Sequence, residues 1–147
     1  MATLLKAAFA TGTAHVLTTS WALVATGTTV PRVVFKAANG RRVLLAQAKI
    51  QMANAEYGAG TTVRLKLRRV NNGAKDVANS ATTYDVGIYS SGQDLTEAIL
   101  TLPPVSYRLS GKANDRVELW AKVDALPDNS SGGGQVQIDE ASLVALS

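Results

Sequence analysis

The chain of 147 residues contains no cysteine and a single histidine, His15. Without cysteine there is neither a disulfide framework nor a thiolate ligand or nucleophile, and one imidazole cannot supply a site that needs two histidines. No stretch approaches the roughly 20 apolar residues that cross a bilayer, and the N-terminus lacks the basic region of a signal peptide. We therefore expect a protein that is made in the cytoplasm, is stabilised by packing alone, and contacts no membrane.

Patterns typical of enzymes are also missing. No serine lies in a G-x-S-x-G motif, and the glycines do not have the spacing of a phosphate-binding loop. Asp139 and Glu140 are adjacent, so a regular strand would direct them to opposite faces. Asp124, Asp128 and Asn129 carry oxygens that suit calcium, but a polar hairpin loop is the favoured interpretation. We expect a protein that is not an enzyme, with no catalytic residue, no metal and no cofactor.

What the sequence does contain is alternation. Hydrophobic residues make up 46% of the chain and aromatic residues only 5%, so Val, Leu, Ile and Ala must fill the core. Apolar and polar residues alternate with period two in several windows, separated by Gly-, Asn- and Pro-rich turns. The expected strands cover 20–25, 30–37, 43–52, 61–70, 81–89, 97–102, 105–110, 116–124, 135–139 and 142–146, after a first strand that contains His15. A helix is expected only at 3–9 or near 94–98. The predicted fold is all-β: a single two-sheet antiparallel β-sandwich, jelly-roll-like, over residues 13–147, preceded by an N-terminal arm, residues 1–12.

The strand at 61–70 carries a row of cations. Arg64, Lys66 and Arg68 share one face, and Val63, Leu65 and Leu67 share the other. Residues 32–75 contain ten Lys or Arg and one acid, whereas residues 76–147 contain four bases and ten acids. This bipolarity favours a partner of mixed charge, including another copy of the chain. Because no aromatic residue is expected on the cationic face, we expect no nucleic-acid binding, and the three cations should face water or the acids of a neighbouring subunit or shell.

The strand at 116–124 alternates strictly, with Val117, Leu119, Ala121 and Val123 inward and Trp120 outward. The C-terminal third of the chain contains the segments EAILTLPPVSYRLS (97–110), NDRVELWAKVD (114–124) and QVQIDEASLVALS (135–147). In these segments it resembles the last three strands of the trimeric jelly rolls related to complement globular heads and tumour necrosis factor, a type that occurs in many phage virion proteins. That resemblance implies a homotrimer in which the strands at 43–51, 98–102 and 136–146 face the three-fold axis. Leu45, Gln47 and Lys49 would then lie in or near the subunit interface.

The resemblance also implies a function. Phage members of this type include capsid decoration (cement) proteins and fibre tips, and nearly all of this chain is jelly-roll domain. The expectation is a virion structural protein, a trimer that binds the major capsid protein or another virion protein and cements the shell. Leu4, Leu5, Lys6 and Phe9 of the arm are the candidate capsid contacts. The alternative is a receptor-binding or tail-associated module for host carbohydrate, for which Trp120, Tyr84, Tyr89 and Tyr107 are the aromatic material.

Overall fold

The computed structural model describes residues 4–27, 29–35, 39–70, 73–90, 97–109, 111 and 115–146, with residues 4–12 described by their backbone. Its strands are β1 (Leu4–Val16), β2 (Ala22–Leu23), β3 (Arg32–Phe35), β4 (Arg41–Ala53), β5 (Thr61–Val70), β6 (Ala74–Asp76), β7 (Thr82–Val86), β8 (Glu97–Thr101), β9 (Val105–Arg108), β10 (Asp115–Val123) and β11 (Gln135–Leu146). The one helical element among these residues is a short 3₁₀ turn, η1 (Ser130–Gly132), and they include no helix long and apolar enough to cross a membrane.

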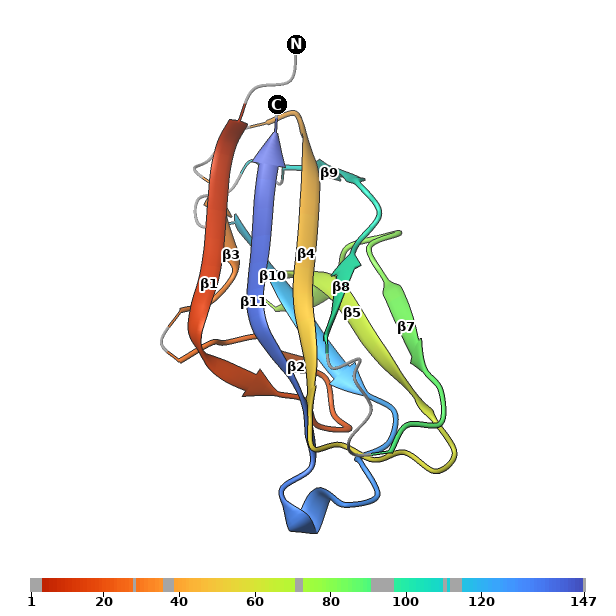
Figure 1. Ribbon diagram of the computed structural model, residues 1–147. Coiled ribbons are helices and arrows are strands. Elements are labelled where there is room, and N and C mark those ends of the chain that lie inside the picture. The colour runs from red at the N-terminus through yellow and green to blue at the C-terminus, as the bar shows by residue number, and fades with distance from the viewer. Residues whose placement is uncertain are drawn as a thin grey trace.

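The strands form two antiparallel sheets that pack face to face, as predicted (Figure 1). Sheet A has the order β1-β11-β4-β8, and β9 pairs with β4 beyond the end of β8. Sheet B has the order β2-β10-β5-β6, with β3 on the same edge of β10 as β2, and β7 on the same edge of β5 as β6. The start of β1 and the end of β11 lie at one end of the sandwich, near β9, and η1 lies at the other end (Figure 1).

The core is built by the alternation that the sequence predicts. In β4 every second residue from Leu44 to Met52 is buried, and β5 and β10 bury Val63, Leu65 and Leu67 and the series from Val117 to Val123 in the same way. Because successive side chains of a strand point to opposite faces, each long strand contributes one apolar row to the space between the sheets. The inward and outward assignments for these three strands are confirmed.

The start of the chain differs from the prediction. Residues 4–16 form β1, which pairs with β11 from Leu4↔Leu146 onward, so the described residues 4–9 form neither the expected helix nor an arm that stands apart from the sandwich. An Ala- and Thr-rich segment suits either structure on local preference. Pairing with β11 favours the strand, because the backbone N–H and C=O groups along that edge of β11 need partners. The boundary of the sandwich therefore lies before residue 13.

The last strand is continuous where two strands were expected. Residues 135–139 and 142–146 belong to a single β11, which contains a β-bulge between Ile138 and Glu140. Val136 and Ile138 are buried before the bulge, and Ala141, Leu143 and Ala145 after it. The extra residue, Asp139, shifts the alternation by one position, which is why the two halves of the strand look like separate strands in the sequence.

Candidate functional site

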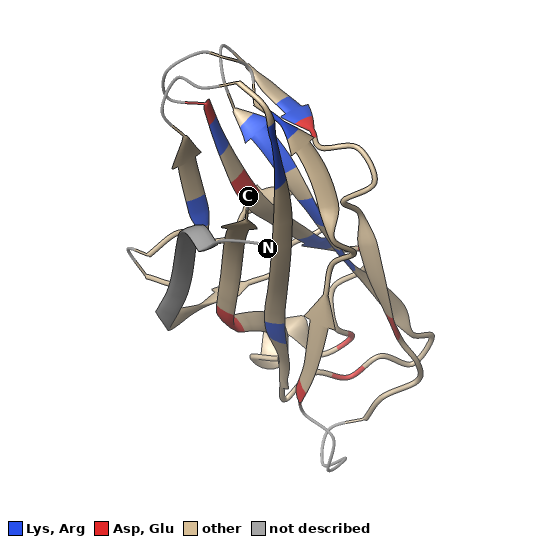
Figure 2. Ribbon diagram, turned by 90° about the horizontal axis from the view of Figure 1, so that it is seen from above, with Lys and Arg blue, Asp and Glu red and all other residues tan. Residues whose placement is uncertain are grey.

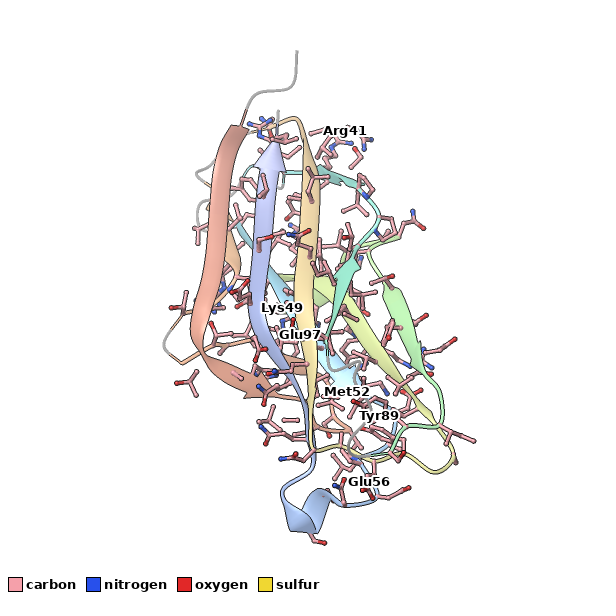
Figure 3. All side chains as sticks on the ribbon, in the orientation of Figure 1. Arg41, Lys49, Met52, Glu56, Tyr89 and Glu97 are labelled. Carbon is pink, nitrogen blue, oxygen red and sulfur yellow. The ribbon has the colours of Figure 1, made fainter. Side chains whose placement is uncertain are left out.

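The outer face of sheet A brings together the three strands that the sequence analysis assigns to a subunit interface. β11, β4 and β8 are neighbours, and their outward side chains lie in register across the sheet. We call this surface the outer face of sheet A; it consists of Val43, Leu45, Gln47, Lys49 and Gln51 of β4, Glu97, Ile99 and Thr101 of β8, and Gln137, Glu140, Ser142, Val144 and Leu146 of β11. Figure 3 shows Lys49 and Glu97 beside each other midway along this face.

The end of this face nearest the termini is apolar. Leu45 pairs with Val144, and Val43, which is 37% exposed, pairs with Leu146. A shallow hollow beside them is lined by side chains that include Leu45, Thr101, Pro104 and Val144. On a sheet with one solvated face, outward positions are normally polar. An apolar group here is therefore a candidate contact surface.

The middle of the face is mixed in character. Lys49 Nζ lies 3.3 Å from Glu97 Oε1, and this hydrogen bond raises the pKa of Lys49. Ile99, directly opposite Lys49, is 71% exposed and helps line a second hollow together with Glu140 and Ser142. Large aliphatic side chains gain free energy when a partner covers them, so Ile99 extends the candidate surface onto β8.

The three residues predicted for the interface lie on successive outward positions of β4. Leu45 and Gln47 line the apolar hollow, and Gln47 and Lys49 line the second one. Ile99 and Val144 were not among the residues predicted for the interface. Both are apolar at outward positions of strands that were otherwise read correctly, and that mismatch was the signal that could have identified them.

The cations of β5 face outward as predicted, and they form ion pairs with acids of the same chain. Arg64 donates to both carboxylate oxygens of Asp124 at 2.8 Å, and these bonds lower the pKa of Asp124. Lys66 and Arg68 both reach Asp76, at 3.1 and 3.2 Å. In Figure 2 the basic positions gather along neighbouring strands with single acidic positions beside them. Acids of the same chain therefore take the role expected of a neighbouring subunit.

The expectation that no aromatic residue lies on the cationic face was wrong. Lys66 Nζ lies 4.0 Å from the ring centroid of Trp21, and the guanidinium of Arg68 lies 4.7 Å from that of Trp120. Trp120 is on this face because β10 pairs with β5, which places it directly opposite Lys66. Each of these cation–π contacts occupies a ring face that a base or a sugar could otherwise use.

The remaining aromatic candidates for carbohydrate binding are also packed against the protein. Tyr107 is buried, stacks on Phe35 and donates a hydrogen bond to Asp115 at 2.8 Å. Tyr84 and Tyr89 are partly buried against the core. Together with the cation above Trp120, this packing leaves none of the four as an open platform.

The three residues considered for a calcium site bind different partners within the chain. Asp124 binds Arg64, Asp128 Oδ2 accepts from the amide of Gly58 at 2.6 Å, and Asn129 Oδ1 accepts from the amide of Glu56 at 3.0 Å. Within the described ranges, no three His, Cys, Asp or Glu side chains converge as metal ligands. The loop bonds hold η1 against the turn after β4, which is a structural use of these residues.

The single histidine lies at the end of β1 and is partly buried. The backbone amide of Ala25 lies 3.4 Å from its Nδ1, and burial lowers the pKa of His15 from its usual value of 6.5. Because the unfolded chain then binds more protons than the folded one, stability is expected to rise with pH through this range and to fall as the pH drops below about 6.5. Urea unfolding at pH 7.5 and 5.5 checks this. His15→Gln should lose less stability than the original chain over that interval, and an equal loss in both would contradict the assignment.

The sequence matches no protein-family model and no curated protein sequence. The fold creates two surfaces that bear on function. One is the outer face of sheet A, which is partly apolar and hollowed. The other is the outer face of sheet B, where opposite charges and aromatic rings are paired within the chain.

Proposed function

We propose that the protein is a non-enzymatic structural protein of a phage virion, which assembles as a homotrimer through the outer face of sheet A and binds and stabilises the capsid shell. The observation that carries the proposal is the outward-facing apolar group on that face, which is exposed at Val43 and Ile99 and half-buried at Leu45. Val43, Leu45 and Ile99 lie on strands that the fold places in one sheet, outside the core. A monomer would leave these side chains in water, whereas packing against further copies removes them from it.

The ion pairs of the other face support the same arrangement. On the outer face of sheet B, Arg64, Lys66 and Arg68 have acidic partners within the chain. Cations that already contact an acid of their own chain present less unbalanced charge to a partner molecule. Self-association is therefore assigned to sheet A, and the ion-paired face of sheet B forms the outside of the assembly.

Two measurements test the proposed function. Sedimentation equilibrium should give a mass three times the 15.4 kDa of the chain, and the purified protein should bind saturably to capsids of its source phage that lack it. Capsids with the protein bound should also withstand heating to a higher temperature than bare capsids. A monomer that neither binds capsids nor protects them, and that binds glycans instead, would favour the receptor-binding alternative.

A further inference from the structure

The end of the sandwich that carries the termini gathers cations from both sheets. Arg41, at the start of β4, pairs across the sheet with Arg108 of β9, and Arg69 of β5 pairs with Lys75 of β6. Arg69, Lys75 and Arg108 line one shallow hollow beside Tyr107. We call the group Arg41, Arg42, Arg69, Lys75 and Arg108 the basic end; Figure 3 labels Arg41 there.

Most of these cations lack the acidic partners found along β5. Arg69 Nε contacts the buried carboxylate of Asp115 at 3.3 Å. Arg41 reaches the hydroxyl of Ser106 at 3.4 Å, and Arg42 donates to the carbonyl oxygen of Arg41 at 2.9 Å. Within the described part of the chain, no carboxylate forms an ion pair with Arg41, Arg42, Lys75 or Arg108. The acid that lines the hollow, Asp76, is already shared by two cations of β5.

This arrangement is unfavourable in the isolated protein. Like charges directly opposite each other on neighbouring strands destabilise a sheet, and Arg41 and Arg108 are such a pair, with both side chains exposed. The opposite end of the sandwich carries acids instead, including Glu56 and Asp128, and Figure 3 shows Glu56 far from Arg41. The chain is therefore polarised along its length, and an anionic partner at the basic end would relieve the repulsion.

We propose that the basic end is a docking surface for an acidic protein surface, bound through carboxylates. Guanidinium groups form paired hydrogen bonds with carboxylates, and three of the four cations without an acidic partner are arginines. A nucleic-acid strand fits less well, because Tyr107, the ring beside the hollow, is buried and stacked on Phe35, so no open ring accompanies the cations.

This proposal rests on the proposed function and identifies which end of the protein meets the shell. In a trimer whose axis runs along the strands of sheet A, three basic ends share one pole. Three weak ionic contacts then act together, which raises the avidity of docking. β1 also begins at this end, at Leu4, so the predicted capsid contacts, which belong to the first half of β1, lie on the part of that strand nearest the same pole.

The test compares two triple variants with the same change in net charge. Arg41→Gln/Lys75→Gln/Arg108→Gln removes the basic end, and Arg64→Gln/Arg116→Gln/Lys122→Gln removes three cations from the outer face of sheet B. Circular dichroism melting checks that both remain folded. The probe is immobilised poly-L-glutamate at low salt, with a single-stranded thymidine oligonucleotide as the second polyanion.

The original chain should bind polyglutamate in a salt-dependent way, and the basic-end variant should bind at least about tenfold more weakly, because ionic docking depends on the cations at the contact. The control variant should bind like the original chain. No binding by the original chain, equal loss in both variants, or a clear preference for the oligonucleotide would overturn the proposal. Salt-sensitive end-to-end oligomers that sedimentation detects for the original chain but not for the basic-end variant would also overturn the proposal, because the occupant would then be a second copy.

Failure here is distinguishable from failure of the proposed function. If the protein is a trimer and the basic-end variant still binds capsids with unchanged affinity, the docking surface is wrong and the decoration role stands. If the original chain is a monomer without capsid affinity but binds polyglutamate through the basic end, the docking surface stands and the decoration role is wrong.

Discussion

Replacing Leu45 with glutamate is expected to convert the proposed trimer into a monomer, so the mass in sedimentation should fall to the 15.4 kDa of one chain. Leu45 points outward beside Val144 and lines the apolar hollow of sheet A. A carboxylate placed there would have to lose its water on assembly without gaining a partner, and burial of an unpaired charge is strongly unfavourable. The fold itself should persist, because Leu45 lies outside the core.

The matched control is Val34→Glu. Val34 is 43% exposed and lies in β3, on the edge of sheet B. The substitution adds the same charge at an exposed aliphatic position that the proposal leaves outside the interface, so this variant should keep the mass of a trimer. If Leu45→Glu remains assembled, or if Val34→Glu dissociates instead, the interface does not lie on the outer face of sheet A.

Replacing Leu119 with alanine is expected to destabilise the fold by about 3 kcal/mol, within the range for buried leucines. Leu119 is fully buried in β10, directly opposite Leu67, and its carbonyl oxygen accepts a bond from Val24. Strands on both sides hold the backbone in place, so the cavity cannot close by collapse. Urea unfolding measures the change, and Ile88→Ala, at a side chain that is 77% exposed, should change stability by less than about 0.5 kcal/mol. A similar small loss at Leu119 would show that the core can repack.

Much of the fold could be predicted from the sequence because its long strands alternate cleanly. β4, β5 and β10 each bury every second residue, and the assignment of inner and outer faces needed no knowledge of their neighbours. What the sequence could not provide was the pairing of distant strands. The contact of Arg68 with Trp120 depends on the register of β5 against β10, and these strands are separated by β6, β7, β8 and β9 in the chain.

The same limit applies to the charged residues. Glu118 occupies an outward position of β10, where the alternation predicts exposure, yet it is buried between Arg32 and Arg116. Arg32 lies far away in sequence and reaches Glu118 only because β3 pairs with β10. The shared outward face of Leu45, Gln47 and Lys49 was easier to predict, because the three residues lie on one strand and strand geometry alone places them together.

The bulge at Asp139 sets which residues of β11 face the core. Before it, the even-numbered residues Val136 and Ile138 lie in the core, and after it the odd-numbered residues from Ala141 do. Since the side-chain period of a strand is two, a strand that accommodated Asp139 as a regular position, and not in a bulge, would exchange the two faces of everything that follows. Leu143 would be directed to solvent, and Ser142 and Val144 would enter the core. The bulge thus determines which side chains of the second half of β11 are buried in the sandwich and which are presented to other molecules.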